Sequence, residues 1–283
     1  MKLKHLTAAV ALGLVAAPAL AGDFTTLPTT GALQAGANNP NVDRFYLDAT
    51  SITWLVADEV PSIINYNAIA TAGGLPRAVT GSGTLTLLDH RVTEDMELPG
   101  EIPGDFDEIG HLYDFVFRDS RDNMLVFGTR VRLGVEPDQS QDSELNFLYR
   151  YGFEEGATTF DVSAAWLFTG DFDLRMYNAG RTDSASLTGA TPYDANTVRM
   201  QSDVNLSEGN PYSGLFLLKT NAQYYTLGDT AIGVFQAGEE GQPRVGADFA
   251  GFIPTAVPEP STYAMLLGGL GLLGAMARRR RNA

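Results

Sequence analysis

Hydrophobic and polar residues alternate along the middle of the chain. The alternation is clearest in residues 112–118 and 124–133. A period of two places successive side chains on opposite faces of a β-strand. Residues 119–123 between the two segments are polar and typical of a turn. The pattern therefore predicts a β-hairpin, with one face of its first strand formed by Tyr113, Phe115 and Phe117.

Other segments of the same part are short, rich in aromatic and β-branched residues, and bounded by Gly, Asn, Asp or Pro. They are residues 52–56, 84–88, 145–151, 158–168, 173–177, 197–201, 215–220 and 231–236. No segment keeps a 3.6-residue period over three turns, and a short helix is expected only at residues 61–71. Many short strands with polar turns predict an all-β body, an antiparallel β-sandwich of jelly-roll-like type.

Four segments lack this pattern and are predicted to be loops or linkers. Residues 25–41 are rich in Thr, Gly, Ala and Asn, which indicates an irregular lead into the body. Residues 92–108 contain seven acids and two Pro-Gly pairs, and predict a long exposed loop. Residues 180–196 are likewise predicted to form an exposed loop. Residues 238–256 are expected to begin a spacer before the C-terminus.

The N-terminus has the pattern of a secretory signal peptide. Lys2 and Lys4 precede an apolar segment at residues 6–17, and Ala19 and Ala21 form a small-x-small cleavage site. We expect export through the Sec translocon and removal of the first 21 residues by signal peptidase. The alternative is an N-terminal anchor that is retained.

The C-terminus has three parts in a distinctive order. A motif comes first, made of Val257, Pro258, Glu259 and Pro260. Residues 261–277 follow without a charge; as a helix they are roughly 25 Å long, at the short end of what spans a membrane. The chain then carries a basic stop that favours the cytoplasmic side, made of Arg278, Arg279, Arg280 and Arg281. The alternative, a helix docked on the body, suits neither the arginines nor the many glycines.

These three parts resemble the PEP-CTERM sorting domain, the substrate signal of exosortases in Gram-negative bacteria that make exopolysaccharide. The resemblance covers residues 257–281, about a tenth of the chain. It implies anchoring in the inner membrane, recognition by a membrane-embedded cysteine protease-transpeptidase, and cleavage near the motif. Release or attachment at the cell surface would follow. It implies nothing about the fold or activity of the body, residues 22–256.

Without its two ends the protein is strongly acidic. The ends hold six of the 19 basic residues and one of the 34 acids, so the body keeps 13 basic and 33 acidic residues, a formal net charge of −20. Such a charge opposes binding to nucleic acid or anionic lipid and fits a solvated extracellular protein or a cation binder. Cysteine is absent, which excludes disulfides, thiol catalysis and thiolate metal sites.

Two Asp-x-Asp pairs are candidate Ca²⁺ ligands, Asp105 with Asp107 and Asp171 with Asp173. Ca²⁺ takes six to eight oxygen ligands, and the EF-hand pattern is missing here. The alternative is solvated acids in turns, so no cofactor is expected beyond this candidate ion. The predicted turn at residues 119–123 is also rich in oxygen ligands, which serve the turn itself.

Histidines and aromatic residues supply the remaining candidates. His111 stands near the acids of residues 105–108 and is a candidate for a metal or acid–base site; the alternative for it, and for His90, is a structural role. Four aromatics are candidates for stacking on sugar rings or for the core: Trp54, Trp166, Tyr224 and Tyr225.

The sequence contains no catalytic motif, and Gly-x-Ser-x-Gly is absent. We therefore expect a non-enzymatic surface or matrix protein with a structural or adhesive role in an exopolysaccharide-rich envelope. The alternatives are a carbohydrate-binding module and a polysaccharide-active hydrolase. An aromatic groove would favour the module, and two acids converging in that groove would favour the hydrolase.

Overall fold

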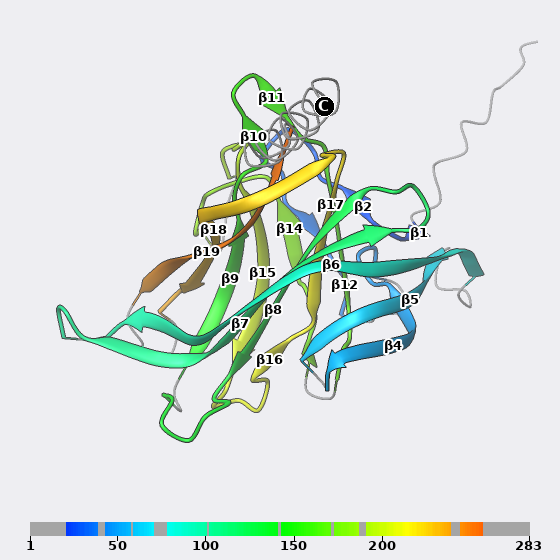
Figure 1. Cartoon of the computed structure of the whole chain (residues 1–283). Helices are drawn as coiled ribbons and strands as arrows, with labels where there is room; N and C mark the ends of the chain where they lie inside the picture. The colour runs from blue at the N-terminus through cyan, green and yellow to red at the C-terminus, as the bar shows by residue number, and fades with distance from the viewer. Residues whose placement is uncertain are drawn as a thin grey trace, which may run out of the picture.

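The computed structural model describes residues 21–38, 43–57, 59–70, 78–100, 102–140, 143–170, 173–186, 191–238 and 244–256. Within these ranges the chain forms β-strands and no helix (Figure 1). No helix there is long or apolar enough to span a membrane. The predicted signal peptide, the sorting motif, the predicted transmembrane helix at residues 261–277 and the arginine stop lie outside the described residues, apart from Ala21 in a short strand.

The larger sheet holds 11 of the strands formed by the described residues. Their bounds are β1 (Ala21–Gly22), β2 (Thr25–Thr26), β4 (Asp48–Val56), β5 (Val60–Ala70), β6 (Ala78–Pro99), β7 (Phe106–Asp119), β8 (Leu125–Leu133), β12 (Val162–Leu167), β13 (Asp173–Leu174), β16 (Tyr212–Ser213) and β17 (Leu215–Thr220). The main order is β1-β5-β6-β7-β8-β17-β12-β2, with β4 on β5, β16 on β8, and β13 parallel to β16. The other pairs in this sheet are antiparallel.

The smaller sheet has six strands and is antiparallel. They are β3 (Gln34–Ala35), β9 (Glu144–Arg150), β14 (Asn178–Gly180), β15 (Val198–Asn205), β18 (Tyr224–Gln236) and β19 (Val245–Thr255). Their order is β19-β18-β9-β15-β14-β3. A separate hairpin pairs β10 (Glu154–Glu155) with β11 (Thr158–Thr159).

Two hydrophobic cores organise these sheets. The main core lies between them, where Trp166 and Phe216 of the larger sheet meet Leu148, Met200 and Ile232 of the smaller one. The second core is enclosed by the larger sheet alone, which curls into a half-barrel around apolar residues that include Tyr66, Leu85, Phe115, Phe117 and Leu217. The body is therefore all-β and sandwich-like, as predicted; the finer jelly-roll-like arrangement stays a prediction.

A buried ion pair joins the two sheets. The Arg150 side chain on β9 is 1% exposed and the Asp114 side chain on β7 is 3% exposed; their Nη1 and Oδ1 atoms lie 2.5 Å apart. Arg150 also donates to Thr129 Oγ1 at 2.9 Å and to the Phe252 carbonyl at 2.6 Å. Asp114 Oδ2 accepts the Phe252 amide at 2.6 Å. The charges are thus paired and further hydrogen-bonded, as burial demands.

The predicted hairpin is confirmed. Strands β7 and β8 pair in register from Gly110 opposite Leu133 to Arg118 opposite Leu125. The turn between them contains Asn123, whose φ of 61° is in the left-handed region. The side chains of Tyr113, Phe115 and Phe117 lie together in the half-barrel core.

Three local predictions are wrong. The helix expected at residues 61–71 is strand β5, in which Ile64, Tyr66 and Ala68 face inward with a period of two. The loop expected at residues 92–108 is mostly the end of β6 and the start of β7, a hairpin arm whose Met96 and Leu98 are buried.

The third wrong prediction is the spacer at residues 238–256. Its described part contains strand β19, which pairs with β18. Elsewhere the irregular lead is confirmed for residues 25–38, which contain only the two-residue strands β2 and β3. Beyond Gly180, the end of β14, the described residues of 180–196 are also free of strands, as predicted.

Candidate functional site

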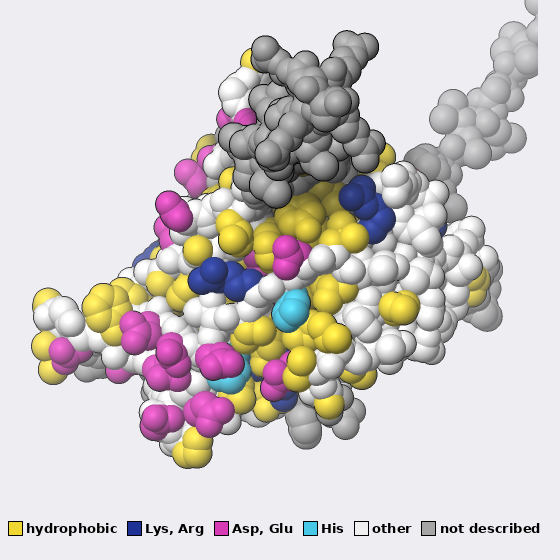
Figure 2. All heavy atoms as spheres, viewed as in Figure 1, with side chains coloured by type: hydrophobic (Ala, Val, Ile, Leu, Met, Phe, Trp, Pro, Cys, Tyr) yellow, Lys and Arg dark blue, Asp and Glu magenta, His cyan; other side chains and the backbone are white. Residues whose placement is uncertain are grey.

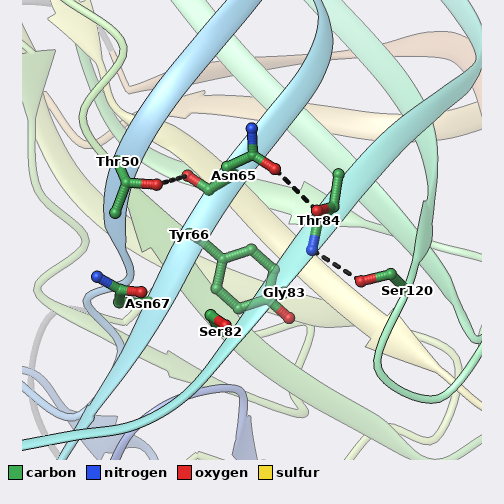
Figure 3. Close-up of a pocket in the computed structure, with 8 residues that line it drawn as sticks. All are labelled: Thr50, Asn65, Tyr66, Asn67, Ser82, Gly83, Thr84 and Ser120. Carbon is green, nitrogen blue, oxygen red and sulfur yellow. Dashed lines mark hydrogen bonds between the residues drawn. The ribbon is translucent and has the colours of Figure 1, made fainter.

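A polar hollow of ≈ 400 Å³ lies over β4, β5 and β6, lined by Tyr66, Gly83 and small polar residues (Figure 3). Several of its side chains are hydrogen-bonded within the protein. Thr84 Oγ1 donates to Asn65 Oδ1 at 2.8 Å, and the Thr84 amide donates to Ser120 Oγ at 2.9 Å. Thr50 donates to the Asn65 carbonyl at 3.2 Å. Among the described residues, those that line the hollow are all uncharged.

Behind this hollow lies a buried charge network. Tyr66 Oη donates to Asp119 Oδ2 at 2.7 Å. Lys219 bridges Asp119 at 2.5 Å and Asp122 at 2.9 Å, and its Nζ lies 4.3 Å from the centroid of the Phe24 ring. Burial and the Asp119 carboxylate raise the pKa of Tyr66. The oxygen-rich turn at residues 119–123 thus holds a lysine.

A second pocket, of ≈ 290 Å³, lies on the outer face of the smaller sheet. It is aromatic, with walls formed by Tyr149, Tyr151 and Phe235. The rings of Tyr149 and Tyr151 are parallel within 2° and 6.3 Å apart. Phe235 stacks on Phe147, with centroids 6.1 Å apart. We call this the aromatic pocket.

Pairing across four strands builds the aromatic pocket. Arg199 of β15, Tyr149 of β9, Gly233 of β18 and Asp248 of β19 are successive cross-strand neighbours, so they share one face of the sheet. Gly233 leaves the space in this row, because a Cβ there would lie 2.4 Å from the Tyr151 hydroxyl. A glycine is therefore needed where the Tyr151 ring crosses β18.

Acidic groups stand at the rim of the aromatic pocket. Asp183 and Asp248 are both exposed, and Tyr151 Oη donates to Asp248 Oδ1 at 3.1 Å. Burial and then the Asp248 charge raise the pKa of Tyr151, so its hydroxyl stays protonated at neutral pH. The rim thus presents carboxylate oxygens that accept hydrogen bonds, next to apolar ring faces.

Two cross-strand neighbours of this row, Tyr149 and Arg199, carry buried polar atoms without partners. Tyr149 is 5% exposed and its hydroxyl has no hydrogen-bond partner. Arg199, fully buried, uses Nη1 on the carbonyls of Ser184 and Ser186 at 2.5 and 2.7 Å, whereas its Nε and Nη2 have none. Burial raises the pKa of Tyr149 to about 12, with Arg199 opposing the rise.

Residues 256–281 match the PEP-CTERM protein-sorting motif. The PEP-CTERM resemblance drawn from the sequence is thereby confirmed for this segment. The motif is a recognition signal for exosortase processing and implies export and membrane-associated sorting toward the cell surface. No curated protein and no solved structure matches the chain.

The structure places the described members of the predicted Ca²⁺ pairs in different settings. Asp105 and Asp107 are exposed at the end of the β6–β7 hairpin, where acidic side chains gather (Figure 2). Asp173 Oδ2 accepts hydrogen bonds from the Thr169 amide and hydroxyl and the Gly170 amide, at 2.6, 2.8 and 3.1 Å. Asp171 lies outside the described residues. Among the residues that the structure describes, no three His, Asp or Glu are grouped to hold a metal.

The histidines fit the structural interpretation. His111 is 8% exposed and its Nδ1 lies 3.4 Å from the Tyr113 hydroxyl. His90 is exposed on β6 and donates its amide to its neighbour Asp89. Neither histidine takes part in the polar hollow or the aromatic pocket.

None of the four predicted aromatics lines the polar hollow or the aromatic pocket. Trp166 is fully buried in the main core and donates to Asp43 Oδ2 at 3.3 Å, so the core interpretation is confirmed for it. The Arg130 guanidinium lies over the Trp54 ring, with its Cζ atom 5.9 Å from the ring centroid. Tyr225 meets Phe252 edge to face, and Tyr224 is exposed.

The residues of the aromatic pocket were not singled out from the sequence. The one available signal was residues 145–151, where apolar and aromatic residues occupy successive positions as well as alternate ones. Such a run predicts a strand that is covered on both faces. Here Leu148 faces the main core, whereas Phe147 and Tyr149 face outward.

Proposed function

We propose that the mature protein is a non-enzymatic structural or adhesive component of an exopolysaccharide-rich cell envelope. The observation that carries this proposal is the sorting motif at residues 256–281, which directs the chain to exosortase and the cell surface. The acidic, cysteine-free composition supports a protein that works solvated, outside the cytoplasm.

The buried acids support a role without catalysis. Burial raises the pKa values of Asp43, Asp114 and Asp173, the kind of shift that general acids show. Each of them accepts at least two hydrogen bonds from the protein itself. These carboxylates hold loops and sheets together, and none lines the polar hollow or the aromatic pocket.

A carbohydrate-binding module is the second candidate, favoured by the aromatic pocket. A hydrolase would use its two rim acids, Asp183 and Asp248, as a catalytic pair. Incubation of the purified protein with host exopolysaccharide, followed by measurement of reducing ends, separates these two candidates. We expect no release of reducing ends.

Retention of the protein in the extracellular matrix tests the structural role. The full chain is expressed in an exosortase-containing host and in a matched strain that makes no exopolysaccharide. We expect the processed protein to stay with the matrix of the first strain and to pass into the medium of the second. Equal release from both strains would contradict the proposal.

A further inference from the structure

Lys219 is the only lysine between residues 22 and 256, and its side chain is 9% exposed. Lysine is almost never buried in a folded protein unless it is paired. The Lys219 Nζ atom lies 2.5 Å from Oδ2 of Asp119, whose side chain is fully buried, and 2.9 Å from Oδ2 of Asp122. It also lies over the Phe24 ring, 4.3 Å from the ring centroid. An amine and a carboxyl group are therefore held in contact with little access to water.

The strands that carry these groups fix their positions. Asp119 ends β7, Asp122 is in the turn to β8, and Lys219 is on β17, which pairs with β8. The Asp119 carboxylate is held by two further groups, because Oδ1 accepts the Arg121 amide at 3.0 Å and Oδ2 accepts the Tyr66 hydroxyl at 2.7 Å. Reacting groups that a structure holds in good orientation reach effective concentrations of about 10⁵–10⁸ M. The fold thus imposes the contact that a reaction between amine and carboxyl needs.

The neighbouring groups supply the acid–base chemistry of amide formation. Asp122, whose side chain is 36% exposed, contacts the amine and can take a proton from Nζ. Loss of that proton leaves an uncharged amine, which is the nucleophilic form of lysine. Burial and the Asp119 carboxylate raise the pKa of Tyr66, so its hydroxyl stays protonated and can donate to the oxygen on which charge develops. The site therefore holds a nucleophile, a proton carrier and a donor to the oxyanion.

Burial favours an amide over an ion pair at this place. Two charges taken out of water lose their hydration, and their mutual attraction often only offsets that cost. An amide carries no charge, and its burial costs little where it is hydrogen-bonded. Here Tyr66 is placed to donate to the amide oxygen and Asp122 to accept from the amide N–H. The product would thus keep the hydrogen-bond partners that the ion pair has now.

We propose that Lys219 and Asp119 condense to an amide that cross-links β17 to the end of β7. The Nζ lone pair attacks Cγ of Asp119, the bond from Cγ to Oδ1 breaks, and Oδ1 leaves as water. Both protons of that water come from the ammonium group, one of them by way of Asp122. One ammonium and one carboxylate thus give one amide and one water molecule, with no oxidant or reductant. This cross-link goes beyond the proposed envelope role and does not depend on it.

The cross-link would give a covalent tie to a chain without cysteine. Lys219 and Asp119 are 100 positions apart in the sequence, so the bond closes a long loop that includes β8 and β17. A covalent bond that closes a long loop stabilises a fold mainly by restricting the unfolded chain. Such a bond is also insensitive to reductant, unlike a disulfide.

Peptide mapping of the full chain, purified in detergent, tests the bond directly. Trypsin cuts denatured protein after lysine and arginine, so the unlinked chain gives residues 119–121, 200–219 and 220–244 as separate peptides. The linked chain gives a single branched peptide, in which residues 119–121 are joined to residues 200–244. Its mass is lower by one water molecule than that of the two linear segments together. We expect this branched peptide as the main form, with fragment masses that place the bond between Asp119 and Lys219.

Three variants separate the bond from a simple ion pair. Lys219→Arg keeps the positive charge but cannot form this amide, so it should give only linear peptides and melt about 10–20 °C lower. Asp122→Asn keeps both reacting groups and should lower the linked fraction of freshly made protein, because the proton carrier is lost. Asp161→Ala removes an exposed acid that accepts a hydrogen bond from Asn221, two positions beyond Lys219. It is the matched control and should be linked as fully as the unaltered protein.

The inference is overturned if protein that circular dichroism shows to be folded gives only the separate peptides. A branched peptide that persists in Lys219→Arg, or a bond at another pair of residues, has the same force. So does a minor linked fraction that does not grow while the folded protein is incubated. If Lys219→Arg does not fold, the map of the unaltered protein decides, with Asp122→Asn as the second variant.

Discussion

The buried pair of Asp114 and Arg150 predicts a large loss of stability when one charge is removed. In Asp114→Ala the Arg150 guanidinium, with its side chain 1% exposed, would lose its carboxylate, and the Phe252 amide would lose its acceptor. Removing one partner of a buried pair costs about 3–5 kcal/mol. The whole free energy of unfolding of a domain is only about 5–15 kcal/mol. The variant should therefore be folded but marginal.

The double variant Asp114→Leu with Arg150→Met separates the pair from its parts. Replacing a buried pair by apolar residues of similar size is often close to neutral. We expect the double variant to lie within about 2 kcal/mol of the unaltered protein. The remaining loss of stability comes from the groups that lose a hydrogen bond, which are the Thr129 hydroxyl and the Phe252 backbone.

Equilibrium unfolding in urea measures both variants, with circular dichroism as the signal. For a body of this size, 1 kcal/mol corresponds to about 2–4 °C, so Asp114→Ala should melt about 6–20 °C lower. Asp183→Ala, which removes an exposed acid, is the matched control and should shift melting very little. A loss below about 1 kcal/mol in Asp114→Ala would refute the claim that this pair ties the two sheets together.

Four further predictions concern sorting, pH, packing and ions. Pro258→Ala with Glu259→Ala should block processing and leave the full-length chain in the membrane fraction on immunoblots; normal maturation would contradict the sorting role. The pKa of Asp173 is raised by burial, so its stabilising effect is present at low pH and lost as pH rises above 3.8 through the folded-state value. The melting temperature of Asp173→Asn, relative to that of the unaltered protein at the same pH, should therefore rise between pH 4 and pH 7. A difference in melting temperature that does not change with pH would contradict this prediction. Gly83→Ala places a Cβ 2.5 Å from the Tyr66 hydroxyl and should cost about 1–3 kcal/mol in urea unfolding, whereas no cost would show that Tyr66 moves freely. NaCl and CaCl₂ at equal ionic strength should raise the melting temperature alike by screening, and a saturating Ca²⁺-specific rise would instead reveal a site.

The parts of the fold that follow from local pattern were predictable. The β7–β8 hairpin was read correctly, because its period of two and its polar turn are contained within 22 residues, from Leu112 to Leu133. The β6–β7 arm was misread as a loop, because Pro and Gly at its end outweighed the buried Met96 and Leu98. Strand β19 was missed for the same reason, since its glycines and alanines carry a weak signal until β18 pairs with them.

The aromatic pocket could not be predicted from the sequence, for a different reason. Tyr149, Arg199, Gly233 and Asp248 belong to four strands that are distant in the chain. Their meeting depends on strand order and register, which a single sequence does not reveal. The same holds for Lys219, whose two carboxylate partners lie about a hundred residues before it.

Lys219 has a practical consequence for handling the protein. It is the only lysine between residues 22 and 256, and its side chain is 9% exposed and held by two carboxylates. Amine-reactive dyes, cross-linkers and aldehyde fixatives act on uncharged, accessible amines, so the folded body offers them little besides its α-amino group. A label directed at amines should therefore attach at one terminal position, and a lysine-specific protease should leave the native body intact. Fixation protocols that depend on lysine will therefore cross-link this protein poorly.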